Sequence, residues 1–125
     1  MNLMTKEFLE ENLFKEFPEL EAGKDAVYYT YLDPDSESDE DRLSEIYHDL
    51  ALCLDPLIDD ADFMEITSKV PANSELAIRL YRKAIILRFQ NDNWFRKFYL
   101  YDWDEYIQRI LYNIKANQES LSAGE

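Results

Sequence analysis

The stretch LAIRLYRKAIILRF, residues 76–89, decides the fold class. Its apolar residues recur at spacings of three and four, which is the period of an amphipathic α-helix. Asn73 or Ser74 precedes the stretch as a candidate N-cap, and QNDN (residues 90–93) follows it as a turn signal. The sequence therefore predicts a helix that ends near Phe89. The buried face of this helix is predicted to comprise Leu76, Ala77, Leu80, Tyr81, Ala84, Ile85 and Leu87.

Three further segments carry the same helical spacing. They are residues 6–17 after a Thr5 cap, residues 39–54 after a Ser38 cap, and residues 103–116 after a capping box of Asp102 and Glu105. Residues 57–70 are ambiguous and are compatible with a short helix. WFRKFYLY, residues 94–101, fits either a helix or a strand.

One segment departs from this helical pattern. AVYYTYL, residues 26–32, is rich in aromatic and β-branched residues and predicts a short strand. We therefore expect a mainly α domain of four to five helices with one short strand or hairpin, and α+β as the alternative. Residues 1–117 are expected to form a single acidic globular domain, and residues 118–125 a flexible tail.

Composition is consistent with one compact domain. The chain has 125 residues, of which 46% are hydrophobic and 14% aromatic, enough for one core. Cys53 is the only cysteine, so no intrachain disulfide can form. The sequence has neither a signal-peptide pattern at its start nor an apolar run long enough for a transmembrane helix, and we expect a cytoplasmic location.

Charge is distributed unevenly along the chain. The formal net charge is −14; residues 1–65 hold 20 acids and 4 bases, whereas residues 66–125 hold 7 acids and 9 bases. Such an excess argues against direct binding to nucleic acid or to an anionic membrane, because both partners are polyanions. Bases are concentrated in residues 76–97. They either neutralise the acidic segments within the fold or, with the neighbouring aromatics, resemble a platform that binds nucleic acid. The net charge favours neutralisation.

No catalytic or metal-binding pattern is complete. Asp33, Asp35, Glu37 and Asp39 match the first positions of a calcium loop, but Ser38 and Ser44 stand where that loop needs its glycine and its bidentate glutamate. Glu45 and His48 form a single ExxH, and a second copy is impossible because the chain has one histidine. Cys53 is expected on a buried helix face, where a thiol is unreactive. The sequence thus predicts a protein that is not an enzyme and needs no metal or cofactor.

Two acidic clusters, at residues 33–41 and 55–65, are the strongest candidate for a functional site. If the helix over residues 39–54 joins them, one edge of the domain carries a negative stripe that would attract a basic protein partner, plausibly one that binds nucleic acid. Tyr28, Tyr29 and Tyr31 are candidate anchors beside it. The simpler interpretation is a solvated face that keeps the protein soluble. The predicted partner-binding residues are Asp33, Asp35, Glu37, Asp39, Glu40, Asp41, Asp55, Asp59, Asp60, Asp62 and Glu65.

Small acidic proteins of this composition include inhibitors and immunity proteins that imitate the phosphate array of nucleic acid, and we take this as the first functional hypothesis. The alternative is a helical structural or assembly subunit that binds through an apolar aromatic patch around residues 94–101. A monomer or a small homo-oligomer is expected in either case.

Overall fold

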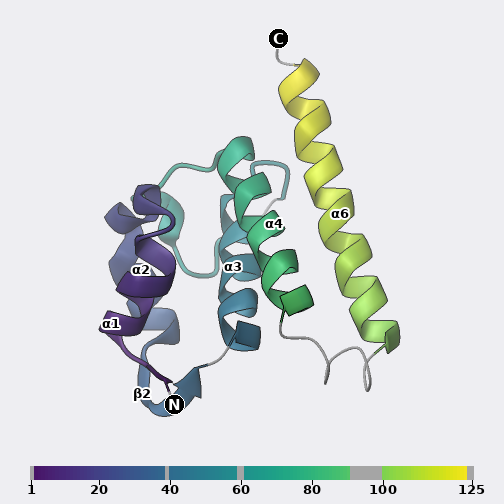
Figure 1. Cartoon of the computed structure of the whole chain (residues 1–125). Helices are drawn as coiled ribbons and strands as arrows, with labels where there is room; N and C mark the ends of the chain where they lie inside the picture. The colour runs from purple at the N-terminus through teal and green to yellow at the C-terminus, as the bar shows by residue number, and fades with distance from the viewer. Residues whose placement is uncertain (1, 39, 59–60, 91–99, 124–125) are drawn as a thin grey trace.

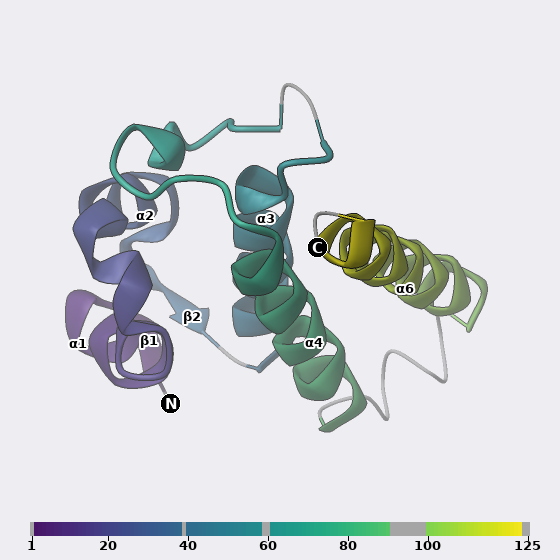
Figure 2. The same cartoon turned by 90° about the horizontal axis from the view of Figure 1, so that it is seen from above.

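The structure of the chain is a computed structural model, and it describes residues 2–38, 40–58, 61–90 and 100–123. The fold is mainly α, as predicted (Figure 1). Three long helices dominate it: α3 (Glu40–Leu54), α4 (Ser74–Gln90) and α6 (Leu100–Ala123). α4 packs against both α3 and α6, so it lies at the centre of this layer (Figure 2).

α4 begins and packs as its sequence predicts. Asn73 caps it, because the Asn73 side-chain oxygen accepts a 2.9 Å hydrogen bond from the Leu76 amide. Leu80, Tyr81 and Ala84 are fully buried on the predicted face. Ser44 of α3 donates a 2.7 Å hydrogen bond to the Ala84 carbonyl oxygen, so a buried polar contact joins α3 to α4.

The N-terminal part is a series of short helical turns. α1 (Lys6–Leu9) continues as π-helix η1 (Glu10–Phe14), and 3₁₀-helix η2 (Pro18–Gly23) leads into α2 (Lys24–Tyr31). Thr5 caps α1 as predicted, since its hydroxyl oxygen accepts a 3.2 Å hydrogen bond from the Phe8 amide. The helix predicted over residues 6–17 is therefore present but irregular, and it ends before residue 17.

The prediction of a strand over residues 26–32 is wrong, because residues 26–31 form most of helix α2. Val27, Tyr28 and Tyr31 are buried, whereas Tyr29 and Thr30 are exposed. That grouping is helical and does not alternate as a strand would. Strand propensity reflects how well side chains pack on a sheet, and here the aromatic rings pack against a helical neighbour instead: Tyr28 meets Phe14 edge to face.

The two strands lie elsewhere. β1 (Asn2–Met4) pairs antiparallel with β2 (Asp33–Ser38), with Asn2 opposite Ser38 and Leu3 opposite Glu37. The register is irregular between Leu3 and Met4. Ser38 is thus a strand residue and not the predicted helix cap, while Asp39, directly before α3, lies outside the described residues.

The remaining boundaries differ from prediction at both ends of the last helix. α6 begins at Leu100 and continues through Ala123, so Asp102 lies within the helix and does not cap it. Residues 118–123, predicted as tail, are also helical. Residues 94–99 of the candidate aromatic patch lie outside the described part of the chain. In residues 57–70 the one described helical turn is η3 (Ile66–Ser68).

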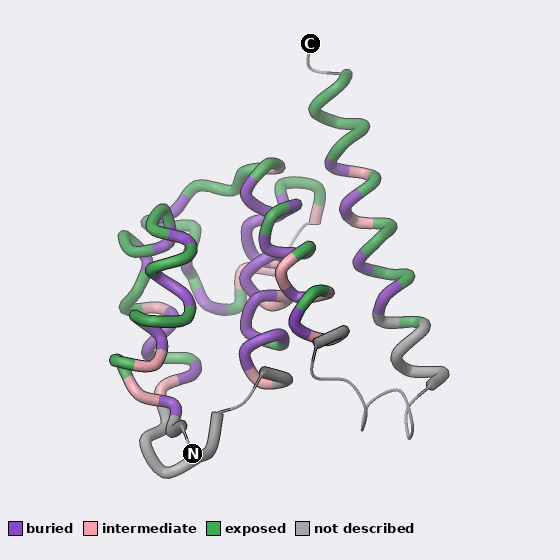
Figure 3. The backbone as a smooth tube through the Cα atoms, in the orientation of Figure 1, coloured by how far each residue is buried: buried purple, intermediate pink, exposed green. Residues whose placement is uncertain are grey.

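Buried side chains join β1 and the described helices and helical turns into one core. α3 is buried along most of its length, and α6 is buried on the side that faces α4 (Figure 3). The largest fully buried side chains include Leu9, Leu20, Ile46, Tyr47, Leu50, Leu80, Tyr81 and Ile110. Among the described helices, none has the length and apolar character needed to cross a membrane.

Candidate partner-binding surface

The first predicted acidic cluster spans a strand and the start of a helix. Asp33, Asp35 and Glu37 belong to β2, and Glu40 and Asp41 belong to the first turn of α3. The structure therefore replaces the expected helix entrance with a strand that leads into the helix. A strand conformation also differs from the tight loop that wraps a calcium ion.

Asp55 does not belong to an accessible surface, so its assignment as a partner-binding residue is wrong. It is only 2% exposed, at the end of α3. One of its carboxylate oxygens accepts a 2.8 Å hydrogen bond from the Tyr81 hydroxyl, and the other accepts a 2.8 Å bond from the Leu57 amide. A buried carboxylate needs such donors, and Asp55 is accordingly a structural residue.

The rest of the second cluster is divided. Asp62 is half-buried and holds the turn before η3, where its carboxylate accepts hydrogen bonds from the Ile66 amide, the Thr67 amide and the Thr67 hydroxyl. Glu65 is exposed and has a left-handed backbone, with φ of 57°. Asp59 and Asp60 lie outside the described residues. Of the four acids other than Asp55, Glu65 is thus the one that the structure leaves fully on the surface of the described chain.

The three tyrosines predicted as anchors also differ in their exposure. Tyr29 is 94% exposed, but Tyr28 and Tyr31 are buried and are not available as anchors. The Tyr31 hydroxyl donates a short hydrogen bond to Asp49 of α3, and the Arg42 guanidinium lies 5.8 Å from the Tyr31 ring centroid. Tyr31 therefore joins α2 to α3.

An acidic surface that the sequence analysis missed lies around Tyr28. Burial raises the pKa of Tyr28, and the carboxylates of Glu10, Glu21 and Asp25 raise it further. All three acids are exposed, and Tyr29 follows Tyr28 on α2. We call Glu10, Glu21, Asp25, Tyr28 and Tyr29 the Tyr28 surface. The excess of acids in residues 1–25 was a signal for it, but three separate elements supply its members.

Lys6 is a base in contact with this surface. Its ammonium lies 5.4 Å from the Tyr28 ring centroid, which is within the range of a cation–π contact. The Tyr28 hydroxyl donates a long hydrogen bond of 3.5 Å to Glu10. A cation thus already rests on this tyrosine ring, among three carboxylates that remain exposed.

The bases of α4 neutralise other acids within the fold. Arg79 pairs with Glu19 at 2.7 Å, and Lys83 pairs with Glu16 at 3.1 Å. Two α4 bases therefore face the N-terminal helical turns, as the neutralisation hypothesis expects.

Of the two groups considered for catalysis, Cys53 is buried and His48 is half-buried. Burial raises the pKa of the Cys53 thiol to about 11, and the thiol donates a 3.0 Å hydrogen bond to the Ala61 carbonyl. Burial also lowers the pKa of His48 to about 4. In the described part of the chain no three His, Cys, Asp or Glu residues are grouped so that they could hold a metal ion.

Comparison with known proteins adds no relative. No family model matches the chain, and no curated protein or solved structure matches it either.

Proposed function

We propose that this protein is a small acidic binding protein, without enzymatic activity, that docks on a basic surface of a partner protein. In this proposal it is an inhibitor or immunity protein that acts in the cytoplasm on a nucleic-acid-binding or nuclease complex. The observation that carries the proposal is the net charge of −16 over residues 1–65, given by 20 acids and 4 bases. Long-range attraction from such a charge accelerates encounter with a basic partner and orients it.

The distribution of ion pairs supports this assignment. Glu16 and Glu19 are paired with bases of α4, whereas the described ion pairs leave out Glu10, Glu21 and Asp25. Partial neutralisation within the fold therefore leaves an exposed acidic remainder on the N-terminal side. Tyr29 supplies exposed aromatic area beside these carboxylates, and tyrosine is one of the residues enriched at interface hot spots.

The β2–α3 acids extend the proposed surface along the chain. The residues assigned to partner binding are now the exposed members of the Tyr28 surface, Glu10, Glu21, Asp25 and Tyr29, together with Asp33, Asp35, Glu37, Glu40, Asp41 and Glu65; buried Asp55 is removed. Carboxylates spread over a rigid scaffold resemble the phosphates that a nucleic-acid-binding groove recognises. Such a protein would block that groove both sterically and electrostatically.

The test is a pull-down from native host lysate with washes at low and then at high salt. We expect a basic nucleic-acid-binding protein that is retained at low salt and released at high salt, because salt screens exposed charges. The triple variant E10Q/E21Q/D25N should lose this partner. A matched control, E75Q/E105Q/E119Q, removes the same formal charge from exposed positions elsewhere and should retain it. Equal retention by both variants would contradict the assignment of the Tyr28 surface.

A second candidate function is a helical subunit of a larger assembly. The observation that favours it is the exposure of Tyr112, at 72%, and of Leu111 on α6, since large apolar side chains in contact with water mark some interfaces. Apolar association is insensitive to screening, so this partner would be retained through the high-salt wash. A Y112S/L111S variant that releases such a partner would establish this function and displace the electrostatic one.

A further inference from the structure

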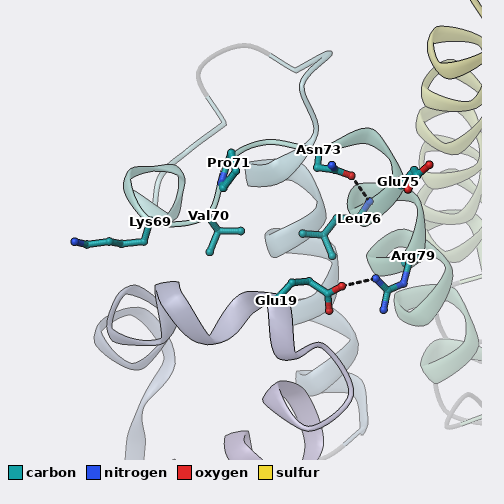
Figure 4. A pocket seen from close by; sticks show the side chains of 8 residues that line it. All are labelled: Glu19, Lys69, Val70, Pro71, Asn73, Glu75, Leu76 and Arg79. Atoms are coloured by element: carbon teal, nitrogen blue, oxygen red, sulfur yellow. Dashed lines mark hydrogen bonds and ion pairs between the residues drawn. The ribbon is translucent and has the colours of Figure 1, made fainter. Parts of the chain in front are cut away.

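A cavity of about 320 Å³ lies between η2, the segment after η3, and the start of α4 (Figure 4). Because three separate stretches of the chain line this cavity, no single sequence motif predicts it. Its size is at the lower end of the range for small-molecule sites. The lining residues are Glu19, Lys69, Val70, Pro71, Asn73, Glu75, Leu76 and Arg79.

One side of the cavity is apolar and firmly held. Val70 and Leu76 are buried, and Pro71 lies beside them. Gly23 backs this side closely: a methyl group there would lie 3.1 Å from the Val70 side chain and 2.7 Å from that of Ile66. The apolar side is therefore fixed before any ligand arrives, which reduces the entropic cost of binding.

The facing side carries a pair of opposite charges. Glu19 and Arg79 are joined at 2.7 Å, and their side chains remain 41% and 49% exposed. The hydrogen bond from Arg79 lowers the pKa of Glu19, which keeps its carboxylate ionised. The Arg79 guanidinium also lies 4.8 Å from the Phe17 ring centroid, so an ion pair and a cation–π contact both hold its position. A guanidinium has five N–H donors, and the contact with Glu19 uses one of its two terminal nitrogens.

The nearby charges restrict the ligand class. The Lys69 side chain points away from the other lining residues (Figure 4), so it adds no charge at the centre of the cavity. A simple anion would meet Glu19, and a simple cation would meet Arg79. A ligand that carries both charges next to one another complements the pair.

We propose that this cavity binds a small aliphatic α-amino acid, with its ammonium at Glu19, its carboxylate at Arg79 and its side chain against Val70 and Leu76. The site is separate from the Tyr28 surface and does not depend on the proposed docking function. Free leucine is the probe of choice, because its side chain is apolar and its ammonium and carboxylate are attached to the same carbon.

The experiment is a titration of the ¹⁵N-labelled full chain with L-leucine, followed by amide chemical shifts. We expect saturable shifts at residues 69–79. N-acetyl-leucine lacks the ammonium and leucinamide lacks the carboxylate, and each should bind about tenfold more weakly or worse, because each loses a charge-assisted hydrogen bond. Equal binding of the three compounds, or no saturable shift with leucine, would overturn the proposal.

Two variants locate the site. R79Q should weaken leucine binding by about tenfold. K83Q is its matched control, since it breaks the neighbouring ion pair to Glu16 on the same helix without touching a residue that lines this cavity. The V70L variant narrows the cavity while the core stays apolar, so it should abolish the chemical-shift changes that leucine causes. It provides an independent test if R79Q fails to fold. Undiminished leucine binding by V70L, with its thermal unfolding unchanged, would place the amino acid elsewhere.

Discussion

Tyr81 of α4 donates a 2.8 Å hydrogen bond to Asp55 at the end of α3, and both side chains are buried. The side-chain Nδ2 of Asn113 on α6 donates a 3.3 Å hydrogen bond to the same tyrosine oxygen. A single hydroxyl thus links the three long helices. Together with the buried Ser44–Ala84 bond between α3 and α4, this link fixes how the helices are oriented along one another.

Replacement of Tyr81 by phenylalanine tests how much this hydrogen bond contributes to the stability of the fold. Y81F leaves a buried Asp55 oxygen without its donor, and we expect a loss of about 1–3 kcal/mol in the free energy of unfolding. Urea denaturation followed by circular dichroism measures it. Y112F is the matched control, because Tyr112 is 72% exposed on α6 and its hydroxyl makes no described hydrogen bond. Similar stability of the two variants would show that the buried bond contributes little.

His48 makes the stability dependent on pH. Burial, together with the positive charges of Arg88 and Arg109, lowers its pKa from 6.5 to about 4. The folded state therefore favours the neutral imidazole, whereas the unfolded chain takes up a proton near pH 6.5. Stability from this group is complete above pH 6.5 and is lost as the pH falls toward 4, by up to roughly 3 kcal/mol.

Because His48 is the one histidine of the chain, its ring protons report its titration directly by NMR. We expect a midpoint well below 6. The variant H48Q should show a smaller decrease in unfolding free energy between pH 7 and pH 4.5 than the parent protein, since its side chain does not titrate. A midpoint near 6.5, or parallel pH profiles for the two proteins, would contradict the expected linkage.

The sequence was sufficient for the elements whose signals are local. The apolar period over residues 76–89 and the helix caps each depend on neighbours within one or two turns. The helix and the Thr5 cap were predicted correctly, and Asn73 is one of the two caps predicted for α4. Residues 26–32 were predicted incorrectly because their β-branched and aromatic content indicates a strand only when a sheet is available to receive them. Here Phe14 of η1 receives Tyr28 instead, and that contact is not written in the segment itself.

The candidate surface was less predictable for a similar reason. Acids can be counted along the sequence, but their exposure is set by partners far away in the chain. Asp55 is buried because Tyr81, 26 residues later, supplies a hydroxyl. Glu10, Glu21 and Asp25 gather around Tyr28 because η1, η2 and α2 fold together. Charge composition therefore predicted the sign of the surface, and only the fold identifies its members.

Cys53 should behave as an inert thiol. Its pKa is raised to about 11 by burial from the ordinary value of 9.0, and the thiolate is the reactive form. At pH 8 its thiolate fraction is about a hundredfold lower than that of an ordinary thiol, by the definition of pKa. We expect reaction with a disulfide reagent such as DTNB to be slower by about that factor in native protein than in urea-unfolded protein. Equal rates in both states would contradict the burial of this side chain.

Gly23 marks a close approach between the N-terminal turns and η3. A methyl group at this position would lie 2.7 Å from Ile66 Cγ1 and 3.2 Å from Ile66 Cδ1, distances that require the isoleucine to shift. Glycine-to-alanine changes in relaxed surroundings stabilise a protein slightly, but overpacking of a core costs about 1–3 kcal/mol. We expect G23A to reduce the free energy of unfolding by an amount in that range, as measured in urea.

The double variant G23A/I66A identifies the cause of this loss. I66A alone creates a cavity in the core and should be destabilising by about 2–5 kcal/mol. The added alanine methyl partly fills the same space, so the double variant should be more stable than the sum of the two single effects implies. Strict additivity would show that Gly23 and Ile66 do not compete for space, and the tight backing of the Val70 side of the cavity would lose its support.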